Sequence, residues 1–420
     1  MNNSLSLAAA GQRITGALFA SQSLFSAATI ASFTLTPIIA VQLAGGEEAA
    51  GVPVTLTWLG RAAVAYPIGW LMDRLGRRNG LSIGYFIGTI GMGLSVMAIM
   101  QASYLWFLLG ALLVGAARAS AEQSRFVAAE AQPSAQRARA MGLIVFAGTI
   151  GAIGGPLLVA PSEHWAAGFG LVGATGPFIA ATVMLLLGLI VTLIFLRPDP
   201  LTVGRQISQD EEAAIPVAER VPRAARPLRE IFGHFNVQLA VTAMVIGQLV
   251  MTLLMVITPV HMDHLHHPTT AVSGVIMAHT LGMFGLSGLT GWLLDRYGRL
   301  PIILAGTAIL ITSALMTPGA VSVPMLAAAL FLLGLGWNFC FLAGSAMLAE
   351  ELRSAERGRA QGVNEMFVAV ASGGGSLTTG AIFVQGGITA VSVVSLALMI
   401  ALGMMALWGF FLNKKLPAVP

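Results

Sequence analysis

Charged residues are scarce in this chain of 420 residues: Asp, Glu, Lys and Arg make up 10% of it, while 56% is hydrophobic. A water-soluble domain of this length needs far more charge to cover its surface. Cysteine is almost absent too, and the single Cys340 excludes an intramolecular disulfide and dithiol redox chemistry. The apolar surplus is therefore predicted to face lipid, and the 49 glycines suit closely packed membrane helices.

Hydrophobic segments recur along the whole chain, each close to or above the ~20 residues that a helix needs to cross a bilayer. They lie at 14–43, 53–72, 80–100, 104–122, 139–160, 168–196, 236–261, 271–293, 301–318, 323–346, 360–384 and 388–412. The first is too long for the apolar core of a signal peptide and is read as a span. The predicted fold class is an all-α membrane protein of twelve transmembrane helices in two six-helix, pseudo-symmetric bundles.

Positive charge is confined to one side of this arrangement. The loops after the odd-numbered spans contain no Lys or Arg. The other side holds Arg13, Arg74, Arg77, Arg78, Arg125, Arg137, Arg139, the arginines between 197 and 229, Arg296, Arg299, Arg353, Arg357, Arg359, Lys414 and Lys415. The positive-inside rule then predicts cytoplasmic termini in a multi-pass protein of a bacterial inner membrane. The formal charge of +4 is thus a topology signal, and we expect no nucleic-acid partner.

A polar stretch rich in Pro and Arg, residues 197–235, predicts a cytoplasmic linker between an N-terminal bundle, 1–196, and a C-terminal bundle, 236–420. The sequence repeats on either side of it. Gly69-Trp-Leu-Met-Asp-Arg-Leu-Gly-Arg77 matches Gly291-Trp-Leu-Leu-Asp-Arg-Tyr-Gly-Arg299, and Arg137-Ala-Arg-Ala-Met-Gly142 matches Arg357-Gly-Arg-Ala-Gln-Gly362. The two offsets are nearly equal, which indicates that the halves are duplicated units.

The first pair of repeats resembles the G-x-L-a-D-r-x-G-r motif of the major facilitator superfamily, and this resemblance covers the whole chain. It implies a secondary transporter whose motif loops follow the second and eighth spans. Physically, glycine permits close helix contact, and the aspartate can pair with a nearby arginine or cap a helix end. Such contacts would hold one end of a transporter shut; the alternative is that the arginines only anchor topology. The motif residues are Gly69, Asp73, Arg74, Gly76, Arg77, Gly291, Asp295, Arg296, Gly298 and Arg299.

Methionine and histidine side chains form a pattern on the seventh and eighth spans. Met251 and Met255 are four residues apart, as are His279 and Met283, so each pair shares one helix face about 6 Å apart along the axis. If the spans pack as an ideal antiparallel hairpin, Met251 lies level with Met283, and Met255 with His279. Thioether and imidazole together suit copper(I). The alternative is that these methionines only fill gaps in an apolar core.

The same pattern resembles the CcoA-like (CalT) branch of the superfamily. That resemblance implies copper import for the assembly of cbb3-type cytochrome c oxidase, with Met251, Met255, His279 and Met283 as the copper-binding residues. The branch also includes riboflavin transporters, so membership leaves the substrate open. Copper would be the transported substrate, no cofactor is expected to be permanently bound, and a cytoplasmic or membrane copper-delivery protein is the implied partner beside lipid.

The loop between these spans concentrates five side chains that can bind metal. They are His261, Asp263, His264, His266 and His267. Imidazole accepts Cu(I), Cu(II) or zinc, so the loop is a candidate capture site. The alternative is a hydrophilic turn that happens to contain several histidines.

Charged residues inside predicted spans complete the candidate set. Arg61 lies midway along the second span, and Arg118, Glu122 and Glu365 lie within or near the inner halves of theirs. Because buried charges are costly, they usually pair or line a wet cavity. Glu122 or Glu365 can carry a coupled proton. Arg61 can attract an anion, which suits an anionic substrate better than a cation, or brace the helix bundle. Arg118 lies one turn from Glu122, the right distance for an ion pair.

The sequence therefore favours a major facilitator that imports copper by alternating access. One rival carries an organic solute such as riboflavin or a drug, with the methionines as apolar lining. A second rival is a membrane metal sensor or assembly scaffold that binds without turnover. No nucleophile–base pair, phosphate loop or nucleotide motif is present in the sequence, so an enzyme is not predicted.

Overall fold

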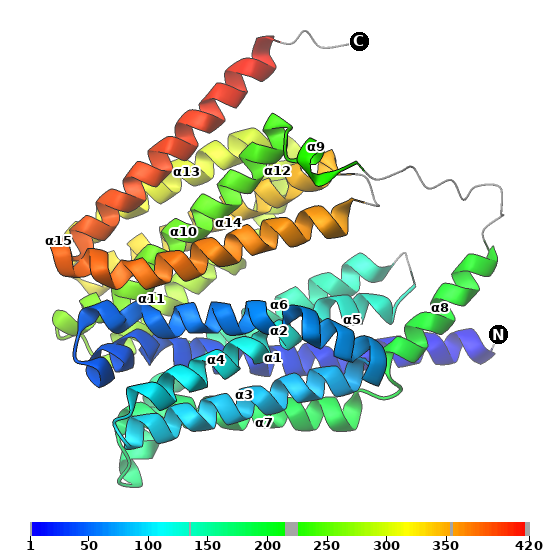
Figure 1. Ribbon diagram of the computed structural model, residues 1–420, viewed down its shortest axis with the longest axis horizontal. Helices are drawn as coiled ribbons and strands as arrows, with labels where there is room; N and C mark the ends of the chain where they lie inside the picture. The colour runs from blue at the N-terminus through cyan, green and yellow to red at the C-terminus, as the bar shows by residue number, and fades with distance from the viewer. Residues whose placement is uncertain (1, 134–135, 215–225, 353–355, 416–420) are drawn as a thin grey trace. The chain divides into compact units, whose positions relative to one another are not determined.

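The computed structural model describes residues 2–133, 136–214, 226–352 and 356–415 (Figure 1). It divides into two units, one of residues 1–45 and 56–221, the other of residues 46–55 and 222–420. Each unit is described by itself.

Nearly all of the described chain is helical, and no strand occurs in these ranges. The helices of the first unit are α1 (Asn2–Ala44), α2 (Val52–Leu75), α3 (Arg77–Met100), α4 (Tyr104–Ala121), α5 (Ser124–Glu130), α6 (Arg137–Gly168), η3 (Gly173–Thr175), α7 (Gly176–Phe195) and α8 (Pro200–Ala214). Those of the second are η1 (Glu47–Gly51), α9 (Leu228–Ile231), α10 (Phe235–His264), α11 (Thr269–Thr280), the π-helical turn η5 (Leu281–Gly285), α12 (Ser287–Tyr297), α13 (Arg299–Met316), η6 (Thr317–Gly319), α14 (Val323–Glu351) and α15 (Arg357–Lys415). The first four residues of α2 belong to the second unit.

Ten helical segments within the described residues are long and apolar enough to cross a membrane. α2 is also long but is not among these ten segments. Arg61 in its interior and Asp73 and Arg74 near its end lower its hydropathy. α15 is continuous by hydrogen bonding but leaves helical geometry at Gly386 and Gly387, so that it bends into two arms (Figure 1). Counting α2 and the two arms of α15 separately gives the expected twelve spans. The all-α fold class is confirmed.

Close helix contacts in the first unit depend on glycine. α1 packs along α6 and α7, and α3 packs along α4 and α7. At Gly151 of α6 a Cβ atom would lie 2.4 Å from the Ser23 carbonyl oxygen of α1, and at Gly155 it would lie 2.8 Å from that of Ala27. The Gly-rich stretch of the fifth span therefore permits α1 and α6 to approach to backbone contact.

α14 is the central partner in the second unit. α10 packs on α14 and α15, while α11 and the turn η5 pack on α14. The sequence argument treated the seventh and eighth spans as an antiparallel pair in contact. That expectation is wrong, because both helices pack on α14 rather than along each other.

The short segment 46–55 docks on α15. A Cβ on Gly51 would lie 1.5 Å from the Ser376 carbonyl oxygen, and the Ser376 hydroxyl donates to the Gly51 carbonyl at 2.7 Å. The Thr55 hydroxyl donates to the Gly373 carbonyl at 2.9 Å. Only glycine fits at position 51, so the close approach of this segment to α15 depends on Gly51.

The interval expected to be a linker contains helices. α8 buries Val203 and Ile207 in the core of the first unit, and α9 precedes α10 in the second. Residues 215–225, and the side chains of the acidic run Asp210–Glu212, lie outside the described part of the chain. Sequence analysis did not predict α8, because only one face of this helix is apolar and the composition of the segment is polar overall.

Candidate functional site

The four predicted copper-binding residues lie on two different helical supports. Met251 and Met255 are on α10, with Met255 6% exposed. His279 is the penultimate residue of α11 and is 1% exposed; its Nδ1 lies 3.0 Å from the Leu330 carbonyl oxygen of α14. Its Nε2 is buried without a hydrogen-bond partner among the described residues. A shared four-residue site stays a prediction. The argument that a direct contact of the seventh and eighth spans brings the two pairs together no longer holds, because both helices pack on α14.

Met283 lies in the π-helical turn η5, where the helical spacing used to place it beside His279 no longer applies. Asn338 of α14 holds this turn: its amide donates to the Met283 carbonyl at 2.6 Å and to the Ser287 hydroxyl at 3.0 Å, and it accepts from Thr290 at 2.6 Å. Asn338 thus bonds one backbone carbonyl and two hydroxyl groups at this irregular turn, and Cys340 is fully buried at the contact of α14 with Gly306.

The side chains of the histidine-rich loop make contacts with several other parts of the second unit. His264 Nε2 lies 3.2 Å from Glu47 Oε1, and both His261 and His264 face the Phe383 ring, at centroid distances of 6.4 and 5.8 Å. His267 Nε2 lies 2.9 Å from the Val321 carbonyl. His266 and Asp263 are exposed. Among the described residues no three His, Cys, Asp or Glu side chains gather closely enough to hold a metal ion.

A buried polar and aromatic network connects α10, α14 and α15, and sequence reasoning missed it. The Trp337 indole donates to Gln248 Oε1 at 2.9 Å and stacks on Phe341 at a centroid distance of 4.8 Å. Phe284 of η5 meets Trp337 edge-on at 6.1 Å. Four residues beyond Gln248, Thr252 lies 3.5 Å from the Ser372 hydroxyl. The only sequence signal was the four-residue spacing of Gln248 and Thr252, which places two polar side chains on one face of α10. The sequence did not show that α14 packs beside this helix.

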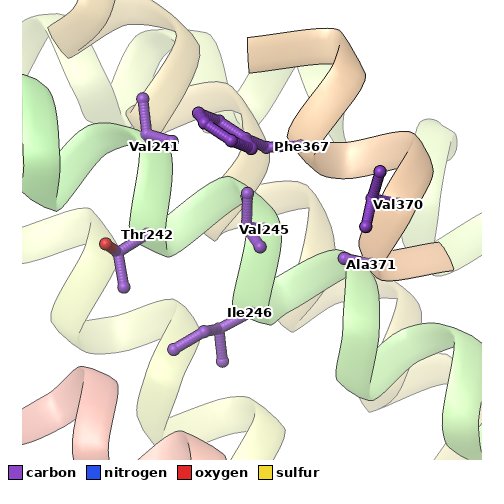
Figure 2. A pocket seen from close by; sticks show the side chains of 7 residues that line it. All are labelled: Val241, Thr242, Val245, Ile246, Phe367, Val370 and Ala371. Carbon is purple, nitrogen blue, oxygen red and sulfur yellow. The ribbon is translucent and has the colours of Figure 1, made fainter. Parts of the chain in front are cut away.

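An open groove lies between α10 and α15 (Figure 2). It has a volume of about 400 Å³, and Thr242 supplies the hydroxyl among otherwise apolar side chains. The lining residues are Val241, Thr242, Val245 and Ile246 of α10 and Phe367, Val370 and Ala371 of α15. Val241, Val245 and Gln248 are spaced to share one face of α10, so this face runs from the apolar groove into the polar network.

The charged residues of α2 and α4 form one cluster. Glu122 accepts from Arg61 Nε at 2.7 Å and from Arg118 Nε at 3.1 Å. Both guanidinium groups lie over the Trp58 ring, at 4.9 and 5.3 Å from its centroid. The predicted pairing of Arg118 with Glu122 is confirmed, and the structure adds Arg61 and Trp58 to it. Glu365 is partly buried on α15.

The first motif loop is a network of ion pairs and helix caps. Arg77 binds Asp73 at 2.7 Å and Glu130 at 2.8 Å. Asp199 accepts from the backbone N–H groups of Arg77 and Arg78, each at 3.1 Å, and thus caps the N-terminus of α3. Gly76 has φ +92°, a conformation that favours glycine. Sequence reasoning missed Asp199, which lies more than a hundred residues further along the chain.

The second motif loop is built differently. Gly298 repeats the positive φ at +82°, and Arg299 pairs with Glu350 and donates to the Leu294 carbonyl. Arg74 and Arg296 each lie over a tryptophan, Trp70 and Trp292, at 4.1 and 5.6 Å. Asp295 is exposed. A Cβ on Gly69 or Gly291 would meet no atom within 4 Å among the described residues, and close helix contact at these two glycines stays a prediction.

A sequence profile described as Major Facilitator Superfamily matches residues 17–316 and 239–420. The chain is a member of the major facilitator superfamily. It is therefore a multi-pass membrane protein and a secondary transporter. Curated relatives include two from Bacillus subtilis with the names uncharacterized MFS-type transporter YddS and YdeG. YddS is 32% identical over 90% of this chain and 87% of its own, and YdeG is 35% identical over 92% and 90%.

A third superfamily relative is the riboflavin transporter RfnT of Brucella anthropi, 31% identical over 80% of each chain. Solved structures of superfamily members share the fold. A D-xylose–proton symporter superposes with a TM-score of 0.66 at 17% identity, covering 93% of this chain and 96% of its own. The human organic anion transporter MFSD10 superposes with a TM-score of 0.64 at 15% identity, covering 94% and 99%.

Proposed function

We propose that this major facilitator carries a small, largely apolar organic solute, of the riboflavin or drug-like class, across the membrane by alternating access. The groove of Figure 2 is the observation that carries the proposal. Its volume lies in the range of ~300–1,000 Å³ that is typical of small-molecule sites, and its apolar lining suits an organic ring system. The relation to the riboflavin transporter supports the same class of solute.

Gln248, three residues beyond Val245 on α10, would supply the second requirement of such a site, a fixed hydrogen-bonding group. Gln248 is held by Trp337, and Trp337 by Phe341 and Phe284. Aromatic rings bury large apolar areas with little conformational freedom to lose. A planar solute lying along α10 would meet apolar side chains at one end and this rigid set at the other.

The proposal includes an orientation. Arginine and lysine are absent from the loops after the odd-numbered spans and frequent on the other side, which favours a bacterial inner membrane with both termini in the cytoplasm. The motif loops at Gly76 and Gly298 would then face the cytoplasm.

Val245→Trp is expected to block transport, because the larger ring would fill the groove on α10. Uptake of labelled riboflavin into proteoliposomes should fall about tenfold or more, since a steric conflict of 1–3 kcal/mol is comparable to a factor of ten. Val393→Trp is the matched control, because Val393 is 58% exposed on the second arm of α15. Equal uptake by both variants would show that the groove does not bind the solute.

Copper import is the second candidate, and one observation favours it. His279 is buried with its Nε2 unpartnered among the described residues, and Met255 on α10 is also buried. An imidazole nitrogen held ready by a backbone contact on Nδ1 is typical of a metal ligand. Copper would be the transported substrate, handed on to a copper-delivery protein for oxidase assembly as the CcoA-like branch implies.

If copper is carried, His279→Ala should lower cellular copper accumulation to about a tenth of the wild-type value, because loss of a ligand costs tenfold or more in metal affinity. Cellular copper measured by mass spectrometry checks this. The control is His164→Ala, which removes an exposed histidine on α6. Unchanged copper content in the His279 variant would remove copper as a substrate, and riboflavin uptake in the same cells would then decide for the organic solute.

A further inference from the structure

Polar contacts join α10 to α15 at two levels of the second unit. The Asn364 amide nitrogen of α15 lies 3.6 Å from the Met244 sulfur of α10. Eight residues further along both helices, the Thr252 and Ser372 hydroxyl oxygens lie 3.5 Å apart, so the two helices run parallel here. Every residue with which α15 lines the groove falls between Asn364 and Ser372. The groove wall formed by α15 therefore lies between these two polar levels.

Asn364 carries a hydrogen-bond acceptor that is not used. The residue is 4% exposed, and its Oδ1 is buried without a hydrogen-bond partner among the described residues. The orientation of the amide follows from its neighbour, because the Met244 sulfur can only accept, and it also accepts from the Ser345 hydroxyl at 3.4 Å. An amide with its nitrogen toward the sulfur gains a weak hydrogen bond, whereas the reverse orientation gains none. The unsatisfied atom is therefore the oxygen.

A buried acceptor without a donor costs free energy, and native proteins contain few of them. An exception indicates either a bound water or a ligand that supplies the missing donor. Asn364 shares one face of α15 with Phe367 and Ala371, three and seven residues further on. Both of these residues line the groove. The unused acceptor thus belongs to the face of α15 that forms the groove, where a bound solute can supply the donor.

Gln248 of α10, three residues beyond Val245, offers the opposite polarity. The Trp337 indole can only donate, so its bond to Oε1 turns the amide nitrogen of Gln248 away from it. One N–H of that nitrogen reaches the Thr252 hydroxyl at 3.4 Å. The second N–H has no acceptor among the described residues. α10 therefore presents a donor and α15 an acceptor.

We propose that Asn364 is a specificity-determining residue of the transport site, which accepts a hydrogen bond at Oδ1 from a ring N–H group of the solute. Gln248 donates to a ring carbonyl of the same solute. Asn364 is level with Met244, and Gln248 lies about 6 Å further along the axis of α10, a separation that a fused ring system can span. The inference rests on the proposed function, and it narrows the solute to a planar heterocycle with both an N–H and a carbonyl group.

Riboflavin and riboflavin methylated at its imide nitrogen are matched probes, since methylation removes the ring N–H and leaves the ring carbonyls in place. Their binding to the full chain in phosphatidylcholine nanodiscs can be followed by flavin fluorescence polarisation. We expect the wild type to prefer riboflavin by about tenfold, in the range for one hydrogen bond to a buried group. Asn364→Ala should weaken riboflavin by about the same factor and abolish the preference. Its affinity for the methylated flavin should stay unchanged, which shows that the variant is folded.

Two further variants separate the acceptor from its surroundings. Ser345→Ala removes the other hydrogen bond to the Met244 sulfur and leaves Oδ1 of Asn364 in place, so the preference for riboflavin should persist. Gln248→Leu should weaken both flavins equally, because methylation does not alter the ring carbonyls. A loss confined to riboflavin in the Gln248 variant would assign the ring N–H to Gln248 and overturn the proposal.

Equal affinity of the wild type for the two flavins would assign the Asn364 acceptor to a bound water and overturn this inference alone. A preference for riboflavin that survives in Asn364→Ala would overturn it as well. If neither flavin binds the wild type, the proposed function is overturned together with the inference.

Discussion

Arg226→Ala is expected to destabilise the second unit more than any other single charge removal outside the spans. Glu356 is fully buried and accepts three hydrogen bonds from Arg226, at 2.9, 3.0 and 2.8 Å, from the backbone N–H, Nε and Nη2. The carboxylate raises the pKa of Arg226 above its ordinary value, so the pair stays charged. Removing the arginine takes three hydrogen bonds and a positive charge from a buried carboxylate, which costs more than losing a surface ion pair.

The thermal midpoint of the detergent-solubilised variant, followed by tryptophan fluorescence, should fall by at least about 6 °C. Arg229→Ala is the control, because Arg229 is exposed three residues further along the same segment. The double variant Arg226→Met/Glu356→Leu should recover much of the loss, since an apolar pair removes the buried charge as well as its partner. Equal midpoints for the Arg226 and Arg229 variants would contradict the prediction.

This pair also shows why part of the linker could not be read from the sequence. Arg226 lies in a polar stretch that suggests solvent, yet its N–H and guanidinium bind the loop between α14 and α15, 130 residues away. Asp199 behaves similarly, as a helix cap for residues 121 and 122 positions earlier. Composition reports the average environment of a segment, whereas these contacts depend on which distant backbone groups need a partner.

The spans themselves could be predicted, because the hydropathy of a membrane helix is a local property. The bend of α15 at Gly386 and Gly387 falls between the predicted eleventh and twelfth spans, where the chain needs a positive φ. Helix order in the sequence does not fix which helices touch. The expected contact of the seventh and eighth spans failed for this reason, since α14, which follows much later, packs against both.

For the candidate sites too, features within one helix could be predicted and contacts between helices could not. The Arg118–Glu122 pair was predictable, because i and i+4 on one helix are neighbours in any fold. The spacing of His279 and Met283 looked equally secure, but a π-helical turn begins between them at Leu281 and changes the register. The Trp337 network and the groove of Figure 2 require three helices to be placed together, which no pattern within one segment specifies.

Gly115→Ala should have the largest effect of any substitution that adds one carbon to the first unit. The new Cβ would lie 2.0 Å from the Thr57 carbonyl oxygen, and the other close atoms are also backbone, so no side chain can rotate away. α2 and α4 would have to separate, at a cost of about 1–3 kcal/mol or more, and the Arg61–Glu122 pair at 2.7 Å would open with them. We expect low recovery of folded protein after solubilisation in detergent.

Gly93→Ala on α3 isolates this effect. A Cβ at Gly93 meets no atom within 4 Å among the described residues, while the gain in helix propensity, roughly 1 kcal/mol, is the same at both positions. The Gly93 variant should therefore be at least as stable as the wild type, which the thermal midpoint followed by tryptophan fluorescence can check. Because the two variants differ only in what the new methyl meets, similar recovery of folded protein would mean that the backbone contact between α2 and α4 contributes little to stability. A loss confined to Gly115→Ala would connect the backbone contact directly to the charge cluster that it holds in place.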